Sequence, residues 1–432
     1  MKFATHYAKF SNLLKGLKFM NFIDLFAGCG GLSLGLIQAG WSGLFAVEKD
    51  PLAFATLKHN LINGKFSGFA WPSWLECEEM PISRLLGKHR ASLRRLKGTV
   101  DLIAGGPPCQ GFSLAGSRSK KDPRNKLIHE YLKVVNIISP TFLLLENVKG
   151  FDVAFKDGTS RRRNKSYAQY VAEKLTDIGY RASTKFINCT EYGIPQRRCR
   201  YFLIAVKVAG VNKIKPVKNS PFEILDKIRD GFLAGKGLNP NKFITVREAI
   251  SDLQVKGKKM IPSRDSSVEG YMQIQYELPK KLTAYQSFLR RGMVNGAPPT
   301  DLRLPRHSDG TIKRFSEILE RCHKGKMICR EDREYFGIKK RAITPLSPTQ
   351  PSATITTLPD DMIHYSEPRI LTVRENARLQ SFPDWYSFRR KYTTGGKARK
   401  KECPRYTQVG NAVPPLLAEV LGTAILKLAS NP

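Results

Sequence analysis

Acidic residues are scarce in this sequence. Its 432 residues include 37 Asp and Glu against 72 Lys and Arg, so the formal net charge is +35 and the pI is near 10.0. A positive charge of this size predicts a polyanionic partner, either nucleic acid or an anionic membrane surface. Hydrophobic residues make up 41% of the chain, an ordinary share for a folded protein, and the length suits two lobes better than one core.

Long apolar runs are also lacking. No continuous run approaches the roughly 18 residues that a membrane-spanning helix needs. The opening "MKFATHYAKFSNLLKGLKFM" has neither the apolar core nor the small-residue cleavage site of a signal peptide. These absences count against membrane-spanning and secreted proteins. We therefore predict a cytoplasmic protein that faces nucleic acid.

The eight cysteines lack the spacing of a disulfide framework or a zinc site. There is no CxxC pair, and the nearest approach to a metal cluster, Cys322, His323 and Cys329, has no second close pair. We predict separate reduced thiols and no metal site. Cys109 stands apart because in "GGPPCQGFS" (105–113) it follows two prolines, whose fixed φ stiffens the backbone that presents the sulfur.

The first part of the chain predicts a βαβ unit. "NFIDLF" (21–26) and "GLFAVE" (43–48) are expected strands, and "LSLGLIQAG" (32–40) is an expected helix between them. The glycines after the first strand let the backbone approach a ligand, and Glu48 is placed to accept hydrogen bonds from ribose hydroxyls. Ser33 stands where the dinucleotide fingerprint has its third glycine. The pattern therefore indicates a nucleotide-like cofactor without identifying it.

Two further apolar runs, "VDLIAGG" (100–106) and "PTFLLLENV" (140–148), are expected to be strands covered by helices on both faces. Each ends in polar residues. Because ligands of open α/β sheets gather at the carboxyl ends of the strands, Cys109 and Glu146 should share one rim with Gly28 and Glu48.

A thiol and a carboxyl group on one rim suit a particular chemistry. A thiolate attacks electron-poor carbon, and a neighbouring carboxyl group can protonate or hydrogen-bond the attacked ring. Addition of sulfur at carbon 6 of cytosine, with protonation at the ring nitrogen, makes carbon 5 able to accept a methyl group. Taken singly, Cys109 could still be a buried inert thiol and Glu146 a surface ion-pair partner.

Six motifs, in this order, resemble those of the DNA (cytosine-5)-methyltransferase family, in its bacterial form. They cover about 21–207 and 345–425. "GGPPCQGFS" together with "ENV" is the most specific signal. The resemblance implies a Rossmann-like α/β sheet of the S-adenosylmethionine-dependent methyltransferases, with a second, smaller DNA-recognition domain. The motifs are "DLFAGCGGLSLG", "GGPPCQGFS", "ENV", "YGIPQRRCR", "LTVRENARLQSFPD" and "QVGNAVPP".

The resemblance also implies roles for residues at matching positions. Cys109 would be the nucleophile, Glu146 would contact the cytosine ring nitrogen and exocyclic amine, and Arg198 and Arg200 would help to hold the flipped base. The residues implied to bind S-adenosyl-L-methionine are Phe26, Gly28, Gly30, Gly31, Glu48, Pro108, Asn411 and Val413. Those implied to contact DNA are Gln110, Ser113, Gln196, Arg118, Lys120 and Lys121.

Two departures from the family pattern concern the adenine of the cofactor. The family usually has an Asp after the second strand to contact the adenine amine, and here Glu78, Glu79 or another residue would serve. Lys49 stands where an aromatic side chain often covers the adenine.

The implied reaction moves a methyl group from S-adenosyl-L-methionine to carbon 5 of a cytosine flipped out of a specific double-stranded DNA sequence, through a covalent Cys109 adduct. We expect a catalytic and cofactor-binding domain over 1–207, completed by 406–432. A small domain would span 208–405, with target recognition in about 208–344 and family motifs in 345–384. The expected protein acts as a monomer on DNA, with a cognate restriction endonuclease as a further partner.

Four alternatives stay open. An RNA cytosine-5 methyltransferase would share the motifs, and the charge does not separate it. A non-catalytic DNA-binding protein on the same scaffold would be expected to lack Cys109 or Glu146. Enzymes that methylate amino groups usually have an aromatic residue where Cys109 follows the prolines. A nicotinamide dehydrogenase is disfavoured by Ser33.

Basic runs and a repeated tetrapeptide complete the pattern. At least two of the runs 88–97, 161–165, 339–341 and 389–401 are expected to face phosphates. The family resemblance implies that the polar segment 113–126 closes on DNA. "TVRE" occurs twice and predicts a capping box and a helix start each time, with Thr245 and Thr372 as the N-caps.

Overall fold

The computed structural model describes residues 20–64, 66–108, 125–153, 166–208, 220–340, 342–394, 398 and 401–430. Several residues of the predicted site lie outside this part of the chain. They are Cys109, Gln110, Ser113, Arg118, Lys120 and Lys121. The basic run 161–165 and most of the segment 113–126 also lie outside it.

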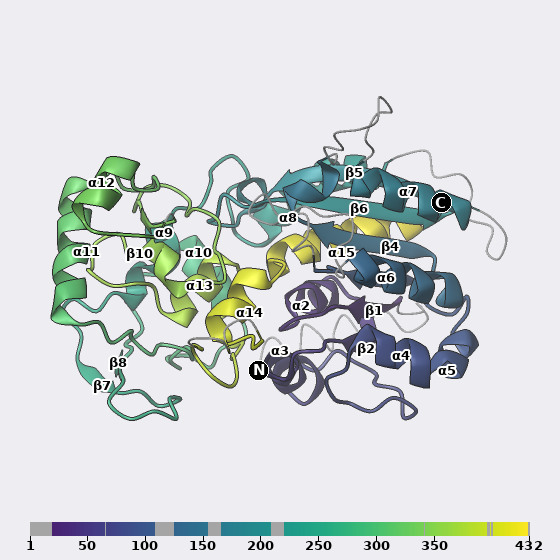
Figure 1. Cartoon of the computed structure of the whole chain (residues 1–432), viewed down its shortest axis with the longest axis horizontal. Coiled ribbons are helices and arrows are strands. Elements are labelled where there is room, and N and C mark those ends of the chain that lie inside the picture. Colours follow the sequence, from purple (N-terminus) through teal and green to yellow (C-terminus); the bar gives the residue numbers. More distant parts are fainter. Residues whose placement is uncertain are drawn as a thin grey trace.

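A six-stranded mixed sheet forms the centre of the fold, with the strand order β2-β1-β3-β4-β6-β5 (Figure 1). β6 runs antiparallel to both neighbours, and the other pairs are parallel. The predicted α/β class with a mostly parallel sheet is therefore confirmed. The strands are β1 Asn21–Leu25, β2 Ser42–Val47, β3 Leu102–Gly105, β4 Phe142–Asn147, β5 Tyr180–Asn188 and β6 Cys199–Lys207.

Helices cover both faces of this sheet, which explains why its central strands are apolar on both sides. Phe22 and Leu144 face one layer, whereas Ile23 and Leu145 face the other, as the period-two geometry of a strand requires. The first layer contains α2 Gly31–Gln38, α8 Pro221–Gly235 and α15 Pro415–Ser430. The second contains α4 Ile82–Lys88, α5 Arg90–Arg95, α6 Asn125–Ile138 and α7 Tyr167–Asp177.

The remaining elements lie mainly to the left of the sheet in Figure 1. The helices are α3 Pro51–Leu57, α9 Val246–Ile250, α10 Ala284–Leu289, α11 Asp309–Arg321, α12 Arg330–Tyr335, α13 Val373–Leu379 and α14 Arg405–Asn411. The short strands are β7 Met260–Pro262, β8 Met272–Ile274, β9 Thr344–Pro345 and β10 Met362–Ile363. Short 3₁₀ or π turns are η1 Lys58–Ile62, η2 Lys149–Asp152, η3 Cys189–Tyr192, η4 Ser251–Leu253 and η5 Pro359–Asp361.

Segments on both sides of the predicted domain boundary near residue 207 pack against one another. α8, which follows that boundary, packs against α15, and one hydrophobic cluster runs from Phe22 in the sheet to Val246 and Phe382. A separate small cluster around Phe315 and Ile318 supports α11. The division at 207 stays a prediction.

Both "TVRE" segments start helices by the predicted mechanism. Thr245 caps α9 and Thr372 caps α13, each accepting from the backbone N–H of the Glu three residues later. In both cases that Glu side chain returns to the N-cap backbone, which completes a capping box. The prediction of two independent helix starts is confirmed.

The C-terminal helix α15 is a core element. Among the described residues, one span, Arg405–Ser430, is long enough and apolar enough in composition to cross a membrane, with a mean hydropathy of 1.5. However, 78% of its most apolar window is buried in the protein, where α15 packs on α2 and α8. The expectation that no stretch reaches this length was wrong for this span, and core packing explains its composition.

Close packing of α2 on α15 depends on a small residue at position 35. A Cβ atom on Gly35 would lie 2.4 Å from Ala418 Cβ and 2.4 Å from the Pro415 carbonyl oxygen. We predict that Gly35→Ala lowers the free energy of unfolding by about 1–3 kcal/mol, since neither contact can move aside. Urea unfolding would measure this change.

Gly87→Ala is the matched control for this prediction. Gly87 lies in α4, and a Cβ there would meet no atom within 4 Å. The helix propensity of alanine should make this variant neutral or more stable by up to about 1 kcal/mol. Equal effects at both positions would contradict the packing argument.

Candidate active site

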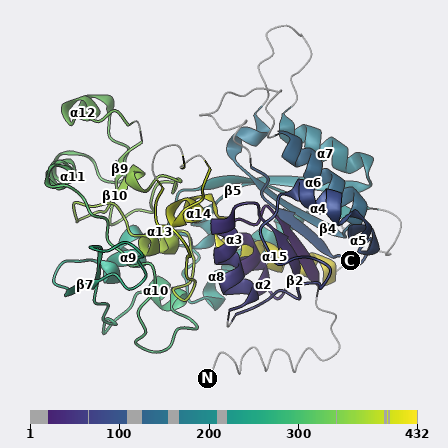
Figure 2. The ribbon, with the colours of Figure 1, turned by 60° about the horizontal axis from the view of Figure 1, so that its bottom comes forward.

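The sheet has a change of direction between β1 and β3. From β1 the chain continues to β2 on one side, while β3 and β4 lie on the other, so a crevice is expected at the carboxyl ends of β1 and β3. Residues 26–30 and 106–108 follow these two ends directly. α14 contacts α3 close to this crevice (Figure 2).

The turn after β1 has an unusual backbone. Phe26 has a φ of 63°, Gly28 of 57° and Gly30 of 90°, and a positive φ is rare for a bulky residue such as phenylalanine. Such strain persists only where surrounding contacts impose it, and it is common at ligand sites. A Cβ on Gly28 would meet nothing within 4 Å, so open space adjoins this turn.

Glu48 holds the turn from the end of β2. One carboxylate oxygen accepts the Gly28 N–H at 2.9 Å, and the other accepts the Asp50 N–H at 2.8 Å. Burial raises the pKa of Glu48, whereas these two hydrogen bonds lower it in part. The acid that the sequence placed 20 residues after Gly28 therefore contacts that glycine directly.

Asp24 is a buried acid that the sequence analysis overlooked. It lies fully buried in β1, where one carboxylate oxygen accepts the Ser33 hydroxyl at 2.5 Å and the other has no hydrogen-bond partner. Burial, opposed by the Ser33 hydrogen bond and reinforced by Glu48, raises the pKa of Asp24 to about 7. A lone acid within an apolar strand was the available signal in "NFIDLF".

The raised pKa of Asp24 predicts a pH dependence of stability. An unfolded Asp titrates near 4, so between pH 4 and 7 the folded state binds a proton that the unfolded state does not. The free energy of unfolding should fall by about 2 kcal/mol from pH 5 to pH 7 because of this group. Asp24→Asn, which can still accept the Ser33 hydroxyl, should remove that part of the dependence. Urea unfolding at pH 5 and pH 7 would measure the change in the free energy of unfolding for both proteins. An equal change in wild type and Asp24→Asn would contradict the argument.

The C-terminal motif reaches the same turn. A Cβ on Gly31 would lie 2.4 Å from the Val413 carbonyl oxygen, so the two backbones are in close contact. Asn411 is exposed and hydrogen-bonds Cys403, a thiol whose pKa is raised by burial and by nearby Asp50. The structure thus brings residues 411–413 next to residues 28–31, although 380 residues or so of chain separate them.

Glu146 and Arg200 form the second half of the rim. Arg200 Nε lies 3.2 Å from Glu146 Oε1, and both side chains are largely but not fully buried. Glu146 is the next-to-last residue of β4, and a Cβ on Gly106 would lie 3.3 Å from its other oxygen. Asn147 donates to the Pro107 carbonyl at 3.4 Å. The segment "ENV" therefore contacts the segment that leads through exposed Pro108 to Cys109.

Arg198 does not face this rim. It is 2% exposed, and its guanidinium donates to the backbone carbonyls of Gly410 at 3.1 Å and Ala412 at 3.2 Å. Burial lowers the pKa of Arg198 to about 9, with Arg200 nearby as a further cause. In this structure Arg198 links the start of β6 to the C-terminal motif, and its contact with a flipped base stays a prediction.

Gln196 is likewise a structural residue in this structure. Its side chain is fully buried, accepts the Ile355 N–H at 2.9 Å and donates to the Leu379 carbonyl at 3.2 Å. Its contact with DNA stays a prediction. The sequence "QRRCR" does not indicate which of its polar residues are buried, because their hydrogen-bond partners come from distant segments of the chain.

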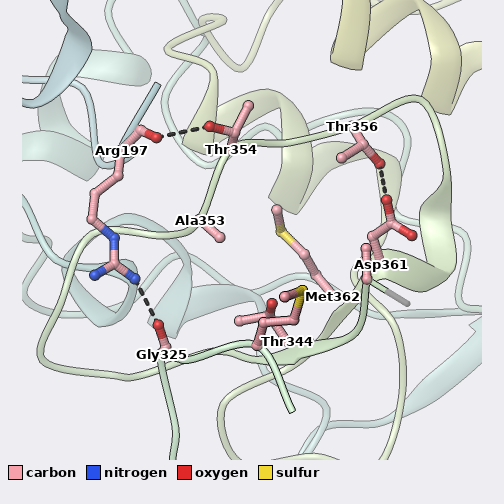
Figure 3. A pocket seen from close by; sticks show the side chains of 10 residues that line it. Arg197, Gly325, Thr344, Ala353, Thr354, Thr356, Asp361 and Met362 are labelled. Atoms are coloured by element: carbon pink, nitrogen blue, oxygen red, sulfur yellow. Dashed lines mark hydrogen bonds between the residues drawn. The ribbon is translucent and has the colours of Figure 1, made fainter. Parts of the chain in front are cut away.

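Arg197, between these two residues, lines a pocket of about 420 Å³ (Figure 3). Its guanidinium donates to the Gly325 carbonyl at 2.7 Å, and its own carbonyl accepts the Thr354 hydroxyl at 2.7 Å. Figure 3 shows Thr356 hydrogen-bonded to Asp361 on the far wall. The full lining is Arg197, Gly325, Met327, Ala342, Thr344, Ala353, Thr354, Thr356, Asp361 and Met362.

The residues considered for the adenine lie beside β2. Met80 donates its N–H to the Glu48 carbonyl at 2.8 Å, which brings the preceding acids close to that strand. Glu78 pairs with Arg84 at 2.7 Å, whereas Glu79 and Lys49 are exposed. Within the described ranges, no three His, Cys, Asp or Glu side chains are grouped as a metal site would need.

Comparison with known proteins identifies the family. Residues 20–427 match the model of the C-5 cytosine-specific DNA methylases. Type II methyltransferase M.DdeI of Desulfomicrobium norvegicum is 31% identical over 94% of this chain and 88% of its own length. Type II methyltransferase M.XorII of Xanthomonas oryzae pv. oryzae is 31% identical over 94% of this chain and 84% of its own.

A solved structure agrees with the fold. A prophage-encoded protein of E. coli has a TM-score of 0.65 and 25% identity over 95% of this chain and all of its own. Together with the strained turn at Gly28 and the Glu146–Arg200 pair, these matches confirm the resemblance read from the motifs. The chain belongs to the family of C-5 cytosine-specific DNA methylases and is a DNA cytosine-5 methyltransferase.

Proposed function

We propose that this enzyme transfers a methyl group from S-adenosyl-L-methionine to carbon 5 of a cytosine flipped out of a specific double-stranded DNA sequence, through a covalent adduct with Cys109. The observation that carries the proposal is the Glu146–Arg200 pair, which lies beside Gly106 at the carboxyl end of the sheet. The same edge holds the Gly28 turn and Glu48, so a carboxyl group for the base and a cofactor turn share one crevice.

The cofactor half fits the residues present. The Gly28 turn has open space beside it and is fixed by Glu48, whose position at the end of β2 suits ribose hydroxyls. Gly31 and Val413 bring the C-terminal motif against this turn, and Phe26, Gly30, Pro108 and Asn411 would complete the pocket. When bound there, S-adenosyl-L-methionine supplies the electrophilic methyl group.

The protein side of the chemistry uses the other half of the rim. The Cys109 thiolate would bond to carbon 6 of cytosine while the ring nitrogen gains a proton, and Glu146 would deliver or share that proton. Arg200 would keep Glu146 oriented and offer donors to the base carbonyl. After carbon 5 is methylated, a base would remove its proton, the sulfur would leave carbon 6 as thiolate, and the ring nitrogen would return its proton to Glu146, which restores the ring.

DNA recognition would involve the surface next to the rim. Arg197 and the pocket that it lines adjoin the turn that ends in Arg200, and this pocket includes residues from 325–362. We propose that this surface contributes to reading the target sequence, together with the segment that carries Arg118, Lys120 and Lys121. The names of the Type II relatives support a restriction-modification role with a cognate endonuclease, and we propose that the enzyme acts as a monomer.

Trapping on 5-fluorocytosine tests the proposal. Duplex DNA with 5-fluorocytosine at random positions would be incubated with the protein and S-adenosyl-L-methionine, then run on a denaturing gel. Fluorine cannot leave as a proton does, so a covalent adduct should form with the wild type and not with Cys109→Ser. Sequencing of the trapped DNA would identify the target.

Structured RNA with 5-fluorocytosine is the parallel arm of this experiment. An adduct that forms with RNA and not with DNA would mean that RNA is the substrate. Binding of DNA without any adduct would overturn the cysteine mechanism and favour the non-catalytic alternative.

A further inference from the structure

A basic surface lies at the edge of the sheet opposite the active site. α5 precedes the start of β3, and Gly98 donates its N–H to the Ile138 carbonyl at 2.9 Å, close to the start of β4. Glu146 lies at the other end of β4. With six residues at roughly 3.3 Å each, that strand separates the two edges by about 20 Å. Figure 1 shows α5 at the side of the molecule away from α11 and α12.

The sequence that forms this edge is strongly basic. Residues 80–100 contain six Lys or Arg and no Asp or Glu. Glu78 and Glu76, from the preceding segment, pair with Arg84 and Lys88. Arg90, Arg94 and Lys97 are exposed, and none of them forms an ion pair with a described residue.

A second element adds a charge to the same edge. Lys207 ends β6, where its N–H donates to the Thr141 carbonyl at 3.0 Å and its ammonium group contacts Ser139. Partial burial lowers the pKa of Lys207, and Lys97 lowers it further because the two ammonium groups lie near each other. The fold therefore brings together like charges from two separate elements.

Helix stability explains only part of this arrangement. Arg94 and Arg95 lie in the last turn of α5, where a cation interacts favourably with the helix dipole. Arg90 is the first residue of the helix, where a cation is unfavourable, and the Lys97–Lys207 approach is repulsive. Both features destabilise the isolated protein, and a bound anion would offset that cost.

We propose that the basic edge, defined as Arg90, Arg94, Lys97 and Lys207, binds a second segment of duplex DNA while another segment occupies the active site. DNA fits because its phosphates repeat along a line, and neutralising them releases counterions. One short duplex cannot serve both edges, since DNA stays nearly straight over about 150 base pairs. The enzyme would thus hold two DNA segments at once. The inference rests on the proposed function only for the DNA in the active site.

Binding stoichiometry tests this proposal without requiring activity. Wild-type protein would be titrated at low salt with duplex DNA of about 15 base pairs, and the mass of the complex measured by sedimentation. We expect two duplexes per wild-type protein and one per Arg90→Gln/Arg94→Gln/Lys97→Gln. Affinity of the wild type for the second duplex should fall with salt with a log–log slope of about −3.6, or about −0.9 per phosphate for the four charges of the edge.

Two further variants separate position from charge. Lys227→Gln/Lys280→Gln/Lys281→Gln removes three exposed charges elsewhere, so both triple variants change the net charge from +35 to +32, and this control should keep two duplexes. Arg90→Lys/Arg94→Lys/Lys97→Arg keeps the charges and should also keep two. The altered side chains are exposed, so all variants should fold, and the Gln variant of the edge should melt at the wild-type temperature or slightly above it because it loses unfavourable charges.

Several outcomes would overturn the proposal. They are a single duplex on the wild type, a second duplex retained by the Gln variant of the edge, loss of the second duplex in the control, or a second site that accepts duplex RNA and not DNA. Failure of 5-fluorocytosine trapping would count against the cysteine mechanism alone, because the stoichiometry is measured with unmodified DNA.

Discussion

Glu146→Gln is expected to lower kcat for DNA methylation by about 10²–10⁴-fold, the usual contribution of a general acid or base. Glutamine keeps the size of the side chain and can accept from Arg200, but it cannot donate a proton to the cytosine ring. Because Arg200 Nε lies 3.2 Å from Glu146, the variant should keep the guanidinium nearby. A methyl-transfer assay at saturating DNA would measure kcat.

Whether the activity loss appears in kcat or in KM distinguishes a lost proton donor from a displaced Arg200. Loss of the proton donor should appear in kcat, whereas a displaced Arg200 should mainly raise KM for DNA. Glu191→Gln, at an exposed acid in η3, is the matched control and should retain wild-type kcat. A Glu146→Gln enzyme within threefold of wild-type kcat would remove Glu146 from the mechanism.

Arg378→Met is expected to lower the free energy of unfolding by about 3–5 kcal/mol. Arg378 is fully buried between Asp252 and Asp384, with Nε 2.8 Å and Nη2 2.7 Å from the two oxygens of Asp384. It also donates to Asp252 and to the Ala249 carbonyl. These contacts hold the pKa of Arg378 above and that of Asp384 below their usual ranges, despite burial. Among the described residues, removing the cation leaves Asp384 with only the longer contact to Arg290 at 3.7 Å and Asp252 with only the Tyr276 hydroxyl.

An exposed ion pair provides the comparison for this variant. Arg321→Met breaks a pair with Asp332 whose Nε–Oδ1 distance is 3.0 Å and whose Arg side chain is 53% exposed, so the loss should stay below about 1 kcal/mol. Urea unfolding of both variants would measure the two changes. A small loss for Arg378→Met would mean that the buried carboxylates find other partners or take up protons.

The order of strands and helices around the cofactor turn was predictable because each signal is local. The apolar runs at 21–26 and 140–148 are strands to within two residues, and the glycines at 28 and 30 adopt the positive φ that the turn needs. The capping boxes at Thr245 and Thr372 depend on residues three apart. Local hydrogen bonding and steric preference decide such features before any tertiary contact exists.

The environment of single polar residues was not predictable in the same way. Gln196 and Arg198 belong to one polar motif with Arg200, yet only Arg200 faces Glu146. Their burial depends on Ile355, Gly410 and other carbonyl or amide groups more than 150 residues away. Asp24 was missed for the same reason, because its desolvation comes from layers of helices that the strand itself does not reveal.

By itself the sequence determined the family and the reaction class, since these depend on residue type and short spacing, and it predicts which residues carry the chemistry. Only the tertiary structure decided which of those residues share the rim, because the C-terminal segment 411–413 must return to Gly31 and β6 must carry Arg200 to Glu146. It likewise placed Lys97 near Lys207, at the edge of the sheet opposite the predicted active site. Burial and proximity arise from packing of distant segments, and no local pattern encodes them.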